Sequence, residues 1–294
     1  VIRSSSELFV HSSFGTNPTF ALSGKNGPST FPTTSLAFRG QLKLTESLTF
    51  RAAVADGVPG NPDDPGGTQV ILRSEDGILA TTEVAYYVGK PDFRKKVRRD
   101  TAAERPRRLV FRRLGRAAEL QYDAKMALGG WLYTTDLDDL SDLDGAGNPV
   151  KRDGTFGIYA LAEKRLYGEP GAHDQGLWAF GEVAYADPKV NRFSHYIGGG
   201  VVYTGLIPGR DRDETAFGFA IARNGSHYKD GQRRDGKGVN DQEVALEWTH
   251  AIQHSSEITI QPDVQYIINP GTSPPRRNAL VLLIRLELTL NWFE

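Results

Sequence analysis

Hydrophobic and polar residues alternate one by one over long stretches of this chain. Between Leu280 and Leu290 every even position holds leucine or isoleucine, whereas Arg285 and Glu287 stand at odd positions. A period of two places successive side chains on opposite faces of a β-strand, while a helix would distribute the same leucines around its whole surface. The stretches at 241-251 and 256-268 follow the same rule. The pattern therefore predicts β-strands with one apolar and one polar face.

The alternation predicts about twelve strands and no helix of any length. Most of these strands are roughly 10 residues long, the length that a tilted strand needs to cross a bilayer, whereas strands of soluble sheets usually have roughly 5 or 6 residues. We therefore expect an all-β fold, a transmembrane antiparallel β-barrel in which residues 1-294 form a single domain. The expected strands are 6-12, 34-44, 47-56, 77-89, 118-134, 155-166, 176-186, 192-204, 214-224, 241-251, 256-268 and 279-291.

The connections between the expected strands differ in length. Those at 45-46 and 252-255 are short, whereas those at 13-33 and 225-240 are long. Barrels of the outer membrane have short periplasmic turns and long external loops. If the C-terminus lies on the periplasmic side, the loops at 225-240 and 269-278 face outward.

Composition narrows the classes of function. The formal net charge is -1, so no strong field attracts nucleic acid. The absence of cysteine excludes disulfides, thiol nucleophiles and cysteine metal sites. The mean hydropathy of -0.41 resembles that of a soluble protein, but barrel strands are only half apolar and give a similar value. No stretch approaches the roughly 18 to 20 apolar residues of a membrane-spanning helix.

One segment interrupts the alternation. Residues 90-117 form a basic insertion loop, with a dense run of arginine and lysine from Arg94 to Arg116. By strand parity this loop lies at the periplasmic end, and we interpret it as solvated. The alternative is that it folds toward the pore and favours anionic solutes. No aromatic platform accompanies the arginines, so we expect no nucleic-acid partner.

The sequence lacks catalytic motifs. Its six histidines do not have HExxH spacing, and GxSxG does not occur. Asp138, Asp139, Asp142 and Asp144 share one expected loop but miss EF-hand spacing, so we interpret them as a solvated acidic loop rather than a calcium site. Gly198-Gly200 lies within a strand and indicates a bend or close packing. We expect no enzyme activity, no cofactor and no metal.

Several motifs carry a family resemblance. They are SSFGTNPT at 12-19, VYTGLIPGRDRD at 202-213, and QPDVQYIINPG at 261-271 followed by NALVL at 278-282. Together they resemble the carbohydrate-selective porins of the OprB family, and GGWLYT at 129-134 fits the middle region of that family. The resemblance extends over nearly the whole chain.

This resemblance implies a barrel of 16 strands with a small N-terminal plug, located in the outer membrane of a Gram-negative bacterium. It also implies facilitated diffusion of glucose-like sugars, with sugars and outer-membrane lipids as partners. Val1 aligns inside the family pattern, so we expect the plug and about four strands to be absent here. A second chain supplying those strands, a homo-oligomer and a closed twelve-strand barrel are the alternatives. The family also tends to end near Leu290 with an aromatic residue, whereas Asn291 to Glu294 follow here.

Candidate pore-lining and sugar-binding residues lie on the polar faces of the expected strands. A sugar-selective pore needs charged or amide groups to replace water around hydroxyls, and an aromatic ring for the C–H face, while binding stays weak. Trp131 is notable because it stands in the polar phase, whereas Trp248 and Trp292 share the apolar phase and are expected at the lipid interface. The candidates are Arg39, Arg51, Glu83, Lys125, Trp131, Glu182, Glu243, Glu247, Arg285 and Glu287.

Two other functions stay open at this point. One is a soluble all-β carbohydrate-binding or adhesin-like protein, and the other is an outer-membrane barrel enzyme. The direction of the apolar faces distinguishes the first from a porin, because a soluble protein turns them inward and a porin turns them toward lipid.

Overall fold

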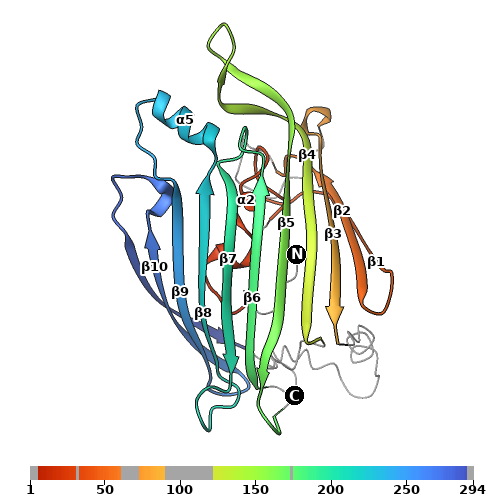
Figure 1. Ribbon diagram of the computed structural model, residues 1–294, viewed down its shortest axis with the longest axis vertical. Helices are drawn as coiled ribbons and strands as arrows, with labels where there is room; N and C mark the ends of the chain where they lie inside the picture. Colours follow the sequence, from red (N-terminus) through yellow and green to blue (C-terminus); the bar gives the residue numbers. More distant parts are fainter. Residues whose placement is uncertain (1–5, 31–32, 61–72, 90–121, 173–174, 290–294) are drawn as a thin grey trace.

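The computed structural model describes residues 6–30, 33–60, 73–89, 122–172 and 175–289. Within these ranges the chain folds into one sheet of 11 strands in sequence order, with antiparallel pairing between neighbours (Figure 1). The expected all-β antiparallel fold is confirmed, with 11 rather than about twelve strands in the described ranges. The strands are β1 (Ala37–Lys43), β2 (Leu48–Asp56), β3 (Ile78–Val88), β4 (Ala124–Leu143), β5 (Pro149–Gly168), β6 (Gly176–Ala186), β7 (Phe193–Thr204), β8 (Glu214–Asn224), β9 (Gln242–Gln253), β10 (Ile258–Ile268) and β11 (Ala279–Leu288).

The sheet curls like the wall of a barrel but is not closed by the described residues (Figure 1). Its two edges are β1, which pairs with β2, and β11, which pairs with β10. The short helical elements are α1 (Ser12–Gly15), α2 (Pro18–Ala21), α5 (Ser226–Arg234), and the 3-10 turns η2 (Ser74–Asp76) and η3 (Pro270–Thr272). None of the helices among the described residues is long and apolar enough to cross a membrane.

The outer face of the sheet is apolar and the inner face is polar. Leu282 and Ile284 on β11 are 69% and 74% exposed, whereas the charged side chains of Lys125 and Glu247 on the inner face are each 1% exposed. A soluble protein buries its aliphatic residues and rarely buries charged ones. An apolar exterior around a polar interior is the arrangement of a membrane barrel. The direction expected for a porin is therefore confirmed.

Two expectations on the periphery have different outcomes. Trp248 on β9 faces outward and is 42% exposed, as expected for a side chain at the lipid interface. Trp292 and the basic insertion at 90-117 lie outside the described residues.

The prediction of a strand at 6-12 is wrong. Residues 6–23, which we call the lumen segment, form turns and the helices α1 and α2. This segment lies inside the curl of the sheet, behind β6 and β7 in the view of Figure 1. Its backbone bonds to side chains instead of a neighbouring strand, because the amides of Val10 and His11 donate to the Glu247 carboxylate at 2.6 and 3.0 Å.

Phenylalanines of the lumen segment pack against glycines of the wall. Phe9 and Phe14 stack with ring centroids 4.3 Å apart. A Cβ atom at Gly218 would lie 2.6 Å from Phe9 and 2.8 Å from Phe14, and one at Gly200 would lie 3.0 Å from Phe9. A larger residue in place of Gly200 or Gly218 would therefore displace the phenylalanine rings. The prediction that the 198-200 glycines mark close packing is confirmed at Gly200.

The acidic stretch after residue 134 belongs to a long β4–β5 hairpin, not to a loop. The side chain of Asp139 is fully buried and pairs with Arg152 and with His227 of α5, both at 2.8 Å. The interpretation as a solvated loop is therefore wrong for Asp139, because its charge is neutralised by these partners. The remaining three carboxylates are exposed, as expected: Asp138, Asp142 and Asp144.

Helix α5 corrects the expectation that no helix is present. It lies in the expected loop at 225-240, at the same end of the sheet as the β4–β5 hairpin (Figure 1). Its sequence is mostly polar, so it lacks the apolar stripe by which a helix is recognised. The bond from the Arg234 guanidinium to the Ser141 carbonyl and the ion pair of His227 attach it to the hairpin.

Candidate functional site in the lumen

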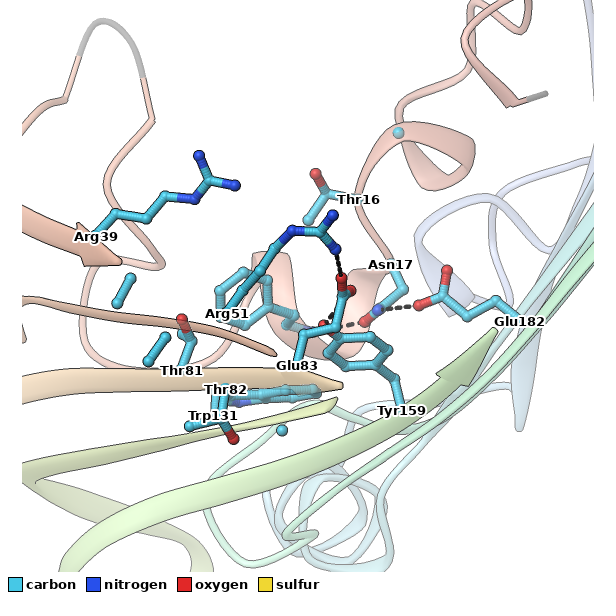
Figure 2. Close-up of a pocket in the computed structure, with 15 residues that line it drawn as sticks. Thr16, Asn17, Arg39, Arg51, Thr81, Thr82, Glu83, Trp131, Tyr159 and Glu182 are labelled. Atoms are coloured by element: carbon cyan, nitrogen blue, oxygen red, sulfur yellow. Dashed lines mark hydrogen bonds and ion pairs between the residues drawn. The ribbon is translucent and has the colours of Figure 1, made fainter. Parts of the chain in front are cut away.

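A cavity of about 170 Å³ lies between the lumen segment and the inner face of the wall (Figure 2). We call it the lumen cavity. Five of the ten candidate residues line it, and they come from five different strands. The lining residues are Gly15, Thr16, Asn17, Phe20, Arg39, Arg51, Ala52, Ala53, Thr81, Thr82, Glu83, Gly130, Trp131, Tyr159 and Glu182.

A charged network forms one side of the cavity. The Arg51 guanidinium donates to Glu83 at 2.5 Å and to the Tyr87 hydroxyl at 2.7 Å. It also donates to the Gln41 amide oxygen at 3.0 Å. The Tyr159 hydroxyl donates to the second oxygen of Glu83 at 2.9 Å. Buried charges are stable only when paired and hydrogen-bonded, so this network holds Arg51 and Glu83 in fixed positions (Figure 2).

Aromatic rings also line the cavity. The Trp131 indole lies 5.0 Å from the Phe20 ring and 6.4 Å from the Tyr159 ring, measured between centroids. A Cβ atom at Gly157 would lie 2.1 Å from the indole, so this neighbouring strand needs a glycine there. Trp131 therefore packs against other aromatic side chains. Its partners are protein rings, and the indole is only 4% exposed.

The rim of the cavity carries an amide and a cation. The Asn17 amide nitrogen donates to Glu182 at 2.5 Å, and its amide oxygen caps α2 by accepting from the Phe20 amide at 2.9 Å. Arg39 extends from β1 toward the cavity in Figure 2. It forms no ion pair with another described residue, and its donors face the lumen space beside Thr16. Amide and guanidinium donors are groups that can replace water around a sugar hydroxyl.

The other candidate residues lie on the inner face but outside the cavity. Glu247 anchors the lumen segment, and Lys125 is buried and acts electrostatically on Glu83. Glu243 accepts from the Gly271 amide. The remaining pair lies on the edge strand β11, where Arg285 donates to Glu287 at 3.1 Å.

Three of the cavity residues that sequence reasoning missed, Asn17, Phe20 and Tyr159, make the contacts described above. Tyr159 occupies the polar phase of β5 in the same way that Trp131 occupies that of β4, so the alternation could have indicated it. Phe20 and Asn17 carry no such signal, because the lumen segment was interpreted as a strand followed by a loop. Their roles depend on contacts with the wall.

His11 shows the electrostatic effect of burial in the lumen segment. Burial lowers the pKa of its imidazole below the ordinary value of 6.5, although Glu243 and Asp263 act in the opposite direction. Its Nδ1 accepts a hydrogen bond from the Ser13 amide at 3.3 Å and caps α1. An acceptor nitrogen carries no proton, so this bond belongs to the neutral imidazole.

One cluster of the described residues has the composition of a metal site. Ligand atoms of Asp139, Asp142 and His227 lie within 4.8 Å of one another. The Arg152 guanidinium pairs with both carboxylates, at 2.8 Å from Asp139 and 2.7 Å from Asp142. The cationic position of the cluster is therefore taken by an arginine, and the arrangement serves to attach α5 to the hairpin.

Comparison with known proteins agrees with this architecture. Porin B of Pseudomonas aeruginosa is 27% identical over 187 residues, which cover 57% of this chain and 41% of that protein. A structure described as the high pH structure of Pseudomonas putida OprB superposes with a TM-score of 0.67 at 20% identity, over 88% of this chain and 59% of that one. The chain thus spans less than two thirds of the length of either protein.

The family itself is identified by a match over almost the whole sequence. Residues 3–290 match the family described as carbohydrate-selective porin, OprB family. The motifs at 12-19, 202-213 and 261-271 all fall within this match, and the sheet has the apolar exterior of a membrane barrel. The chain belongs to the carbohydrate-selective porin, OprB family.

Proposed function

We propose that the protein contributes to a water-filled pore in the outer membrane of a Gram-negative bacterium, through which small, glucose-like carbohydrates diffuse. The lumen cavity is the observation that carries this proposal, because aromatic rings and charged and amide groups line it together. A pyranose has the same two kinds of surface. The family is one of transport channels, and we propose no catalytic role.

In this proposal the groups of the cavity have separate roles. Arg39 and Asn17 offer donors to sugar hydroxyls, while Trp131 and Phe20 present an apolar surface to the C–H face. The network around Arg51 and Glu83 holds these groups at fixed distances and keeps the lumen polar. Few of these contacts are strong, and a solute must leave the site as easily as it enters.

The open edges of the sheet require further strands. Because each of the eleven described strands is antiparallel to the next, β1 and β11 run in the same direction. Closure by antiparallel pairing therefore takes an odd number of additional strands. Exposed edges with unpaired backbone groups are not tolerated in lipid. We propose that these strands come from a further part of the polypeptide or from a second chain. The mass of the purified native pore distinguishes one polypeptide from two.

The proposal is tested by conductance of the full native pore in a planar bilayer, titrated with glucose, a disaccharide and a simple salt. We expect stepwise conductance that falls as glucose is added. Trp131→Ala should weaken the glucose effect about fivefold, since a stacking contact contributes roughly 1 kcal/mol. Trp248→Ala is the matched control, because that ring faces lipid.

Two results would contradict this function. Pores that conduct salt but do not respond to any sugar would indicate a general diffusion pore. Equal loss of glucose response in both tryptophan variants would show that the change is not local to the cavity.

A further inference from the structure

The outer face of the sheet contains a groove that the transport function does not explain. Two adjoining hollows, of about 560 and 1180 Å³, lie across β3 to β9. They share four lining residues, so they form one continuous groove, which we call the outer groove. The shared residues are Leu128, Ala160, Val183 and Ile197.

The floor of the outer groove is low because small residues meet in register. Ala162 pairs with Gly181, and Gly181 pairs with Gly199, so three neighbouring strands lack a long side chain at one level. Larger apolar side chains border this level, among them Met126 and Phe217. The lining is almost entirely apolar, as expected for a surface that contacts hydrocarbon.

One end of the outer groove is polar and basic. Tyr185, His195, Arg223 and Gln242 stand directly opposite one another on β6 to β9, and all four line the hollow. The Tyr185 ring contacts the His195 ring edge-on at 5.2 Å. This row lies at the end of the sheet that carries α5, which begins two residues after Asn224 of β8.

Arg223 and His195 carry N–H groups, which are the donors that an anion accepts from. The Ser194 hydroxyl and His195 Nδ1 lie within hydrogen-bond distance, at 2.8 Å. Arg223 is exposed and has no ion pair with a described residue. Asp241 interacts electrostatically with Arg223, but its carboxylate bonds to Lys229 at 2.8 Å. Arginine is the side chain best suited to bind phosphate through two parallel hydrogen bonds.

The length of the groove matches one leaflet of a bilayer. From His195 to Val201 the strand advances roughly 20 Å at about 3.3 Å per residue. A strand tilted by about 45° covers roughly 14 Å of depth over this distance, and half of a hydrocarbon core is about 15 Å. The basic row therefore stands at the level of the head groups when the apolar floor lies within a single leaflet.

We propose that the outer groove is a binding site for a phosphorylated lipid of the external leaflet. The phosphate binds to Arg223 and His195, and one acyl chain lies over Ala162, Gly181 and Gly199. This inference rests on the proposed membrane location but not on sugar transport. Its function is to fix the barrel at a defined depth and to cover a region where the wall is thin.

The test measures lipid retention by native mass spectrometry of the full pore in detergent. The probes are phosphatidic acid, diacylglycerol with the same chains, and glycerol 3-phosphate. We expect phosphatidic acid to be retained about tenfold more strongly than diacylglycerol, because charge-assisted bonds to phosphate are lost in the latter. Glycerol 3-phosphate should not be retained, since it lacks the chain.

Two variants separate the head-group site from the chain site. Arg223→Gln combined with His195→Gln should lower retention of phosphatidic acid about tenfold, while Arg277→Gln, which removes an exposed charge at the same end, should not. Gly181→Leu should block the floor, because a Cβ atom there meets only the Gly198 carbonyl at 3.8 Å. Gly40→Leu is its control, since nothing lies within 4 Å of a Cβ atom there.

Four outcomes would overturn the proposal. If diacylglycerol is retained as strongly as phosphatidic acid, the phosphate does not contribute to binding. If glycerol 3-phosphate is retained as strongly, the site binds a free anion and not a lipid. Loss of binding in Lys164→Gln instead of the Arg223 variant would place the head group at the opposite end. Loss of a dimer in Gly181→Leu would make a second copy the occupant. Glucose-dependent conductance, recorded in parallel, should stay unchanged, so failure here is distinguishable from failure of the porin function.

Discussion

Removal of the Phe14 ring should loosen the lumen segment and widen the pore. Phe14 is fully buried, stacked on Phe9 at 4.3 Å and edge-on to Phe180 at 6.4 Å between centroids. It occupies the space over Gly218, where no side chain competes with it. Phe14→Ala therefore leaves a void that the rigid strands cannot close.

The size of the effect follows from this packing. Replacing a buried phenylalanine by alanine costs about 3 to 5 kcal/mol. Since about 1.4 kcal/mol corresponds to a factor of ten, the ratio of released to docked segment should rise roughly a hundredfold to several thousandfold. The two hydrogen bonds from Val10 and His11 to Glu247 persist. We therefore expect intermittent release and not permanent loss of the segment.

The assay is single-channel recording of the native pore. Phe14→Ala should show frequent openings to a conductance level above that of the wild type, with weaker block by glucose because Phe20 and Asn17 leave with the segment. Phe217→Ala is the control, because this neighbouring side chain on β8 faces outward and is 51% exposed. A folded Phe14→Ala pore with unchanged conductance and noise would refute the role of this packing.

Three further predictions concern charged and titratable groups. Glu83→Gln should destabilise the barrel by about 3 to 5 kcal/mol, since Arg51 then loses its buried counter-ion, and thermal unfolding in detergent measures this. Asp139→Asn should release α5 from the hairpin by weakening the bond to His227, which faster tryptic cleavage within α5 reports. Acidification should favour release of the lumen segment, because burial lowers the pKa of His11. The contribution of neutral His11 to docking of the segment is present above about pH 6.5 and is lost as the pH falls toward the lowered pKa. His11→Asn should therefore reduce the increase in wide openings at acidic pH.

Matched variants make these three predictions decisive. Lys43→Gln removes an exposed ion pair with Glu46 and should leave the melting temperature almost unchanged. Asp144→Asn changes a neighbouring carboxylate outside the α5 contact and should not alter cleavage. A melting temperature of Glu83→Gln equal to wild type, unchanged cleavage in Asp139→Asn, or identical acid responses with and without His11 would each contradict the assigned contact.

The positions of most strands could be predicted from the chain because alternation is a local property. Each strand from β6 to β10 lies close to its expected range, and the candidate residues of the polar phase all lie on the inner face. The expected end of β4 was too early, because the acidic residues after 134 look like a loop. Their pairing with β5 and the neutralisation of Asp139 by Arg152 and His227 depend on elements outside that stretch.

The lumen segment illustrates what local patterns cannot reveal. Residues 6-12 were expected to form a strand, yet the Val10 amide bonds to Glu247, which is 237 residues away. Phe20 and Trp131 are likewise distant in sequence but adjacent in the cavity. The sequence of β8 alone does not explain why residue 218 is a glycine, because the reason is the packing of Phe9 and Phe14 against it.

The sequence by itself determined the all-β class, the two faces of each strand and the family, because each of these is carried by residues close together along the chain. The tertiary structure alone decided that the apolar face is the outer one, that a segment at the start of the chain occupies the lumen, and which six strands contribute to the cavity. It also decided the register that aligns small residues of β5, β6 and β7 into the outer groove. These features depend on contacts between residues far apart in the chain, which only the pairing and curvature of the sheet bring together.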